Sequence, residues 1–96
     1  MYNEVRYQGL RIEVSLAASR ELVKEGKDLW DVQQILEEGY PCGASKRKPN
    51  IMEQCLRKGR KEYKAVVAKT EIVYPDGYRE AVWRLIHFGQ ITYKKR

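Results

Sequence analysis

The sequence is poor in the residues that build metal and thiol sites. It has two cysteines and one histidine in 96 residues, and Cys42 and Cys55 lack the C-x-x-C spacing of zinc and redox sites. A four-ligand zinc site within one chain would have to recruit carboxylates. We therefore expect no metal and no cofactor. We expect both cysteines to be reduced structural thiols, with a Cys42–Cys55 disulfide as an alternative.

Long apolar runs and nucleotide-binding motifs are also missing. No apolar segment approaches the ~20 residues that span a bilayer, and the start "MYNEVRYQGLRIE" lacks the pattern of a signal peptide. Neither G-x-x-x-x-G-K-[ST], G-x-G-x-x-G nor G-x-S-x-G occurs, which excludes the common phosphate-binding loops and the nucleophile elbow of hydrolases. We expect a cytoplasmic protein with no membrane partner.

The length predicts a single domain, residues 1–96, because two independent cores would each be too small to be stable. With 43% hydrophobic and 33% charged residues, the composition is that of a folded chain. We expect frayed termini at residues 1–9 and 94–96. The segment "YPCGASKRKPN", residues 40–50, has no periodicity and is predicted to be a mobile loop.

Charge is present in excess and is unevenly distributed. The net charge is +6, and residues 46–64 alone hold eight Lys or Arg against two Glu, which accounts for the whole excess. Such segregation favours an anionic partner, RNA first, although a cluster of charges can also simply face water. The candidate nucleic-acid-binding residues are the cations of this segment and one aromatic ring that could stack on bases: Lys46, Arg47, Lys48, Arg57, Lys58, Arg60, Lys61 and Tyr63.

Hydrophobic periodicity predicts an α+β fold. Alternation over residues 10–15 indicates a strand, and two amphipathic segments, 16–25 before Gly26 and 29–38 after the cap Asp28, indicate a helical hairpin. Strands are predicted at 51–58, 61–74 and 78–89, and residues 91–95 could add an edge strand. The expected architecture is an N-terminal strand, a two-helix hairpin, and then an antiparallel meander of three to four strands.

His87 is the natural candidate for proton transfer because its unperturbed pKa, ~6.5, lies near neutrality. Glu53, or Glu62, could be a second proton-transfer group, and Lys64 could stabilise negative charge on a phosphate. These residues would suit metal-independent attack of an RNA 2′-hydroxyl. The alternatives are a hydrogen-bonded histidine at the sheet rim and an ion pair between Glu53 and Arg57.

The turn at residues 75–77 fixes the expected register of the long hairpin. Counting outward from it places Val67 opposite Leu85, Val66 opposite Ile86 and Ala65 opposite His87, unless a bulge intervenes. Whether Lys64 and His87 share a face depends on the hairpin having no bulge, because a single extra residue would move one of them to the other face.

The segments "RIEVSLAASRELVKEGKDLWDVQQILEEG", "EQCLRKGRKEYKAVVA" and "EAVWRLIHFGQIT" resemble a family of small prokaryotic proteins of unknown function placed beside the RelE and BrnT ribonuclease toxins. The last segment carries the pattern W-x-x-x-H-x-G at Trp83, His87 and Gly89. The resemblance implies a RelE-like fold, metal-independent endoribonuclease activity and an acidic antitoxin-like partner. Relatives often have S-x-H-A in the first helix, whereas this chain has Ser15, Leu16, Ala17 and Ala18.

A second interpretation follows from that missing histidine. The chain could be a non-catalytic interaction module whose basic surface binds an acidic protein partner. Pairing of the long strands between two copies, giving a homodimer, is compatible with either interpretation. Trp30 and Trp83 are expected in the core, with an exposed partner-binding role as the alternative.

Overall fold

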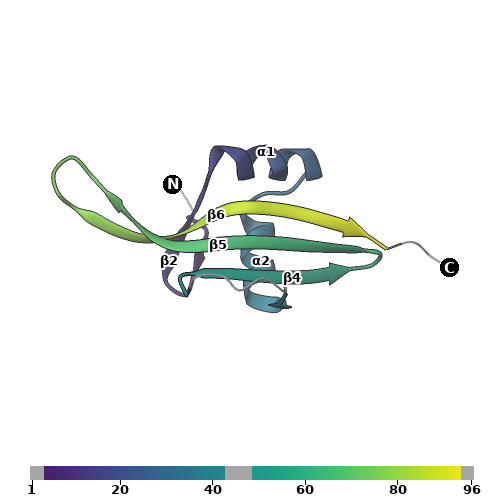
Figure 1. Ribbon diagram of the computed structural model, residues 1–96. Coiled ribbons are helices and arrows are strands. Elements are labelled where there is room, and N and C mark those ends of the chain that lie inside the picture. Colours follow the sequence, from purple (N-terminus) through teal and green to yellow (C-terminus); the bar gives the residue numbers. More distant parts are fainter. Residues whose placement is uncertain (1–3, 43–48, 94–96) are drawn as a thin grey trace.

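The computed structural model describes residues 4–42 and 49–93, in which six strands form one mixed sheet and two helices pack against it (Figure 1). The strand order is β1-β2-β6-β5-β4-β3. The elements are β1 (Arg6–Tyr7), β2 (Leu10–Val14), α1 (Leu16–Glu25), α2 (Leu29–Glu38), β3 (Tyr40–Pro41), β4 (Ile51–Lys58), β5 (Lys61–Val73) and β6 (Arg79–Thr92).

Both helices begin and end where local signals place them. The Ser15 hydroxyl accepts a hydrogen bond from the Ala18 N–H, and α1 ends at Gly26, whose positive φ of 66° suits glycine. Asp28 begins α2 through a capping box with Asp31. The predicted helix bounds, 16–25 and 29–38, are therefore confirmed, as is the strand at 51–58.

The predicted architecture is nevertheless wrong in its topology. Strand β2 is a neighbour of β6 and parallel to it, with Arg11 opposite Val82 and Val14 opposite Leu85. The sheet is therefore mixed rather than an antiparallel meander. Strands β1 and β3 were not expected, and residues 91–92 continue β6 instead of forming a separate edge strand. The RelE-like arrangement that the resemblance implied is corrected with it.

The helices do not form the expected hairpin. Helix α1 packs on β6, whereas α2 packs on β4, β5 and β1 (Figure 1). Both bury apolar side chains on the same side of the sheet, which we call the helix face. Its core consists of Ile12, Ala18, Leu22, Val32, Ile35, Leu36, Tyr63, Ala65, Val67, Trp83, Leu85 and Phe88, with Val5 at its margin. Trp83 is thus a core residue as expected, whereas Trp30 is 51% exposed.

One irregularity in the long hairpin decides which face His87 occupies. Val67 lies opposite Leu85 as predicted, but the register then shifts, so that Val66 lies opposite His87 and Ala65 opposite Phe88. Ile86 is the extra residue of this β-bulge. Without it, His87 would share the face of Ala65, under the helices. The bulge moves His87 to the opposite face of the sheet.

The far end of the β5–β6 hairpin projects from the body of the molecule (Figure 1). The pairing of β4 with β5 ends at Ala68, and that of β2 with β6 begins at Val82, so within the described strands the remainder of the hairpin pairs only with itself. At its base, Arg11 donates two hydrogen bonds to Glu80, each 3.1 Å. The Tyr74 hydroxyl donates a third, of 2.7 Å. These contacts tie the projection to β2.

Two segments expected to be irregular contain strands. Residues 4–9, predicted as frayed, include β1, and the Ile12 N–H donates to the Val5 carbonyl. Residues 40–41, predicted within the mobile loop, form β3 against β4. The other residues expected to be flexible, 1–3, 43–48 and 94–96, fall outside the described residues.

Candidate functional site

The face of the sheet opposite the helices, here called the second face, brings together the three residues predicted to carry catalysis. Glu53 of β4 lies opposite Val66 of β5, which lies opposite His87 of β6. Two residues away along β5, Lys64 lies opposite Gly89. Directly opposed residues share a face, so Glu53, Lys64 and His87 occupy two adjacent cross-strand rows. The Cα atoms of Glu53 and His87 are two strand spacings apart, roughly 10 Å.

Glu53 and Lys64 form an ion pair at the β4 side of this group. The Lys64 Nζ lies 3.1 Å from the Glu53 Oε2, and the Glu53 side chain is 3% exposed against 34% for Lys64. A buried carboxylate is costly unless charged or hydrogen-bonding groups compensate for its lost hydration. The described charged partner of Glu53 is therefore Lys64, not Arg57 as in the alternative drawn from sequence.

Helix α1 brings a further carboxylate, Glu21, to His87. Strand β2 ends at Val14, and α1 continues along the outer edge of β6. There the Glu21 Oε1 accepts a 3.0 Å hydrogen bond from the Phe88 backbone N–H, and the Oε2 lies 3.1 Å from the His87 Nδ1. The carboxylate thus occupies the strand edge that a neighbouring backbone would otherwise fill. The His87 side chain remains half exposed.

Gly89 puts a position without a side chain on the second face, beside His87 and opposite Lys64. A Cβ placed on Gly89 would lie 3.4 Å from the His87 Nε2, so the imidazole leans over the glycine. Lys64 lies directly opposite Gly89 across the strand pair. The imidazole therefore lies over Gly89, and Lys64 stands opposite it across the strand pair, with its ammonium group paired to Glu53. This arrangement suits a substrate that gives up a proton beside a negatively charged group.

The described cations predicted to form one phosphate-binding patch are divided around the tip of the β4–β5 hairpin. Arg57 lies on the second face, with its guanidinium 4.2 Å from the Tyr93 ring centroid. Lys58 donates to a glutamine of α2, and Lys61 lies opposite Lys58, so both belong to the helix side. Arg60 lies in the two-residue turn. The charge of the tip is thus divided, and Arg57 lies on the same face as His87 with Glu62 opposite it.

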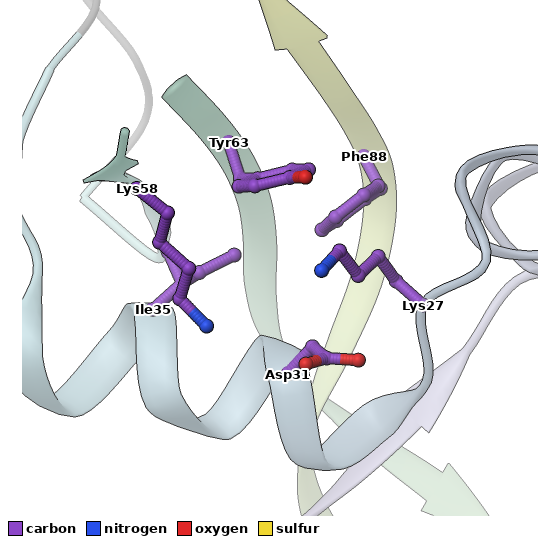
Figure 2. Close-up of a pocket in the computed structure, with 6 residues that line it drawn as sticks. All are labelled: Lys27, Asp31, Ile35, Lys58, Tyr63 and Phe88. Carbon is purple, nitrogen blue, oxygen red and sulfur yellow. The ribbon is translucent and has the colours of Figure 1, made fainter. Parts of the chain in front are cut away.

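Tyr63 lies in the core instead of on a nucleic-acid-binding surface. Its ring stacks on Phe88 at a centroid distance of 6.1 Å and is 7% exposed, and the Lys27 Nζ covers it at 4.6 Å. Figure 2 shows these groups lining a hollow with Asp31, Ile35 and Lys58. The side chains fill the hollow and leave no room for a ligand. The structure therefore leaves the Tyr63 ring no open face on which a base could stack.

The two cysteines form a disulfide, contrary to the expectation of reduced thiols. Strand β3 pairs with β4 through Tyr40 opposite Cys55, and this pairing brings Cys42 to β4 with a Cα–Cα distance of 5.9 Å from Cys55. Cys55 lies opposite Lys64 on the second face, so the bridge adjoins the Glu53–Lys64 pair. The sequence did not reveal the bridge because β3 itself was not predicted.

Other predicted features concern metals, membranes and one group of cations. Within residues 4–42 and 49–93, no group of three or more His, Cys, Asp or Glu side chains is placed to hold a metal ion. In the same residues, neither helix has the length and apolar character needed to cross a bilayer. Lys46, Arg47 and Lys48 fall outside the described part of the chain.

Glu21 is the site residue that the sequence analysis missed. Glu21 is separated from His87 by most of the chain. The one available signal was its position in a helix that directly follows a strand. That helix lies beside His87 only because β2 pairs with β6. Comparison of the chain with protein-family models, curated proteins and solved structures found no match.

Proposed function

We propose that this protein binds RNA across the second face and cleaves it without a metal ion, using His87 and Lys64. The observation that carries the proposal is the placement of His87 and Lys64 on one face of the sheet around Gly89, a position that has no side chain. An RNA 2′-hydroxyl and its neighbouring phosphate are a proton donor and an anion side by side. The resemblance to relatives of RelE and BrnT points to the same class of reaction.

The proposed reaction is an intramolecular transfer at phosphorus. The 2′-oxygen attacks the adjacent phosphorus while its proton passes to His87, the bond from phosphorus to the 5′-oxygen breaks, and the departing 5′-oxygen takes a proton from water. The products are a 2′,3′-cyclic phosphate and a 5′-hydroxyl. Lys64 stabilises the negative charge that develops on the phosphoryl oxygens. The buried Glu53 holds the Lys64 ammonium in place.

Cations at the tip of the β4–β5 hairpin would hold the rest of the strand. From Lys61, in the last pair of the β4–β5 hairpin, to Val66 opposite His87 is five residues along β5, roughly 17 Å. Arg57 and Arg60 lie at that end of the sheet, with Arg57 on the same face as His87. A single-stranded segment running from the hairpin tip to Gly89 would therefore pass Arg57 before it reaches His87 and Lys64.

The test is a gel assay of end-labelled RNA with excess chelator, using the wild-type protein, His87→Ala, and Gly89→Val. The substrates are one RNA and the same strand with a 2′-deoxynucleotide at the mapped cleavage site. We expect the wild type to cleave only the RNA and to leave a cyclic phosphate, and His87→Ala to lose at least about 10²-fold in rate. Gly89→Val places a branched side chain against the His87 ring and should also abolish cleavage.

Matched controls separate chemistry from folding and binding. Thermal unfolding checks that each variant folds, and RNA affinity at fixed salt should change little in His87→Ala. Cleavage of the 2′-deoxy strand, activity that the chelator removes, or full activity of folded Gly89→Val would each overturn the proposed mechanism.

A second candidate function is the non-catalytic module that binds an acidic protein. One observation favours it: next to Arg57 the second face exposes Ile91 and Tyr93, which are 57% and 38% exposed. Apolar side chains beside a cation suit an acidic peptide better than they suit a phosphate backbone. Stoichiometric recovery of one acidic protein free of RNA, together with intact RNA in every lane of the gel, would favour this module.

A further inference from the structure

The Glu21 carboxylate makes two contacts at fixed positions on β6, one to the backbone and one to His87. Its Oε1 is held by the Phe88 N–H at 3.0 Å, which leaves the Oε2 facing the His87 Nδ1 at 3.1 Å. The His87 Nε2 lies at the other end of the ring, next to Gly89. The two ring nitrogens therefore face different surroundings: Nδ1 faces a carboxylate and Nε2 lies over Gly89.

We infer that Glu21 is a positioning residue that fixes the tautomer of His87. An ionised carboxylate only accepts hydrogen bonds, so neutral His87 is held with its proton on Nδ1 and its lone pair on Nε2. Nε2, the ring nitrogen next to Gly89, is then the one able to take a proton. Resting on the proposed function, this assigns to His87 the role of general base toward the 2′-hydroxyl.

The bulge and the helix are both needed for this arrangement. The shift at Ile86 turns His87 onto the second face and places Phe88 in the core. The strand edge at Phe88 is free for Glu21 because β2 has already ended, at the row of Leu85. The anchoring bond to the Phe88 N–H distinguishes Glu21 from a mobile surface carboxylate, since a fixed acceptor can select one tautomer and one ring orientation.

The direct test is the tautomer of His87, measured by long-range ¹H–¹⁵N NMR correlation above the pH at which the ring is charged. The chain has one histidine, so its ring signals need no assignment. We expect the Nδ1–H tautomer in the wild-type protein without RNA. In Glu21→Gln, one oxygen can still accept from Phe88 while the amide N–H₂ faces Nδ1, so we expect the Nε2–H tautomer. Glu25→Gln, one turn further along α1, should retain the wild-type spectrum.

The wild-type spectrum alone keeps the inference testable if Glu21→Gln does not fold. A wild-type ring with its proton mainly on Nε2 would overturn the inference, as would a folded Glu21→Gln protein with an unchanged tautomer. Cleavage assays then separate it from the proposed function. The Nδ1–H tautomer without RNA cleavage would leave the positioning role intact and remove the reaction. Cleavage that is lost in His87→Ala but equal to wild type in Glu21→Gln would support the proposed reaction and remove the positioning role of Glu21.

Where the protein cleaves RNA, Glu21→Gln should lower the rate about 10²-fold or more, because the base nitrogen then carries a proton. RNA affinity should stay within about twofold of wild type, because Glu21 adds no phosphate contact. A loss of affinity without a loss of rate would contradict the positioning role.

Discussion

At the scale of single residues, burial decides between two roles for Tyr63, stacking on RNA bases and packing in the core. Its ring stacks on Phe88 under Lys27 and is almost wholly buried. We expect Tyr63→Ala to lower the free energy of unfolding by about 3–5 kcal/mol, as for other aromatic truncations in a core. Urea denaturation measures this loss.

The conservative variant Tyr63→Phe tests the other role. It keeps the buried ring and removes only the hydroxyl, so RNA affinity should match that of the wild type. A folded Tyr63→Phe protein with tenfold weaker RNA binding would show that the hydroxyl reaches the ligand, and would contradict a purely structural residue.

Glu80 makes stability depend on acid pH. Hydrogen bonds from Arg11 and then from Tyr74 lower the pKa of Glu80 from 4.5 to about 2. A carboxyl group with a lowered pKa stabilises the fold fully above the unfolded pKa, near 4.5, and this contribution is lost as the pH falls through about 2. The melting temperatures of wild type and Glu80→Gln should therefore differ at pH 6 and approach each other between pH 4.5 and 2.

The matched control is Glu71→Gln, which removes an exposed ion pair with Arg79 on the same hairpin. Exposed pairs contribute little, so its melting temperature should track that of the wild type across the whole range. A constant gap between wild type and Glu80→Gln down to pH 2 would refute the assignment.

The sequence predicted which residues belong to the candidate site better than it predicted which of them lie next to one another. Glu53, Lys64 and His87 were singled out by chemistry, and the structure places them on one face. Their grouping depends on a one-residue bulge, which period-two alternation does not reveal. Glu21 was missed for a related reason, because a contact between α1 and the edge of β6 depends on which strand neighbours β2.

At the scale of elements, the junction of α2 with β4 depends on a glycine. A Cβ on Gly39 would collide with the backbone carbonyl oxygens of Cys55 and Ile35, and neither is free to move like a side-chain end. We expect Gly39→Ala to cost about 1–3 kcal/mol of unfolding free energy, the range for overpacked sites, as measured by urea denaturation. Gly89→Ala is the matched control, since its Cβ would meet only the His87 ring at 3.4 Å. Equal stability of the two variants would contradict this account.

The disulfide gives β3 a covalent attachment to β4. Closing a loop between residues separated by 13 positions is expected to stabilise the fold by about 3 kcal/mol through the entropy of the unfolded chain. We expect reductant to lower the urea midpoint of the wild type and to leave that of the Cys42→Ser/Cys55→Ser double variant unchanged. A wild-type midpoint insensitive to full reduction would show that the strand pairing alone holds β3.

This bridge also bears on compartment. Disulfides persist mainly in oxidising environments, so it gives no support to the cytoplasmic location expected from sequence, which stays a prediction.

The bounds of the elements were largely predictable, because caps and periodicity act within a few residues. Their neighbours were not: the β2–β6 pairing joins residues some 70 positions apart, and no local pattern encodes that choice.

At the scale of the whole molecule, the hairpin tip offers a matched pair of cations with which to find the face that RNA contacts. Arg57 lies on the second face beside Tyr93, whereas Lys61 lies on the helix side opposite Lys58. Each carries one charge, and both stand near the same turn. Net charge alone would make their removal equivalent, but a strand bound on the second face would contact only one of them.

We therefore expect Arg57→Gln to reduce the slope of log affinity against log salt by about 0.7, the value for one phosphate contact to a single strand. Lys61→Gln should leave the slope unchanged, and Arg57→Lys should restore it because the charge returns. Fluorescence anisotropy with a labelled single-stranded RNA between 50 and 200 mM salt measures all three, with thermal unfolding to confirm folding. Equal slopes for Arg57→Gln and Lys61→Gln would mean that RNA responds only to the net charge of the tip. Binding across the second face, where His87 and Lys64 lie, would then be contradicted.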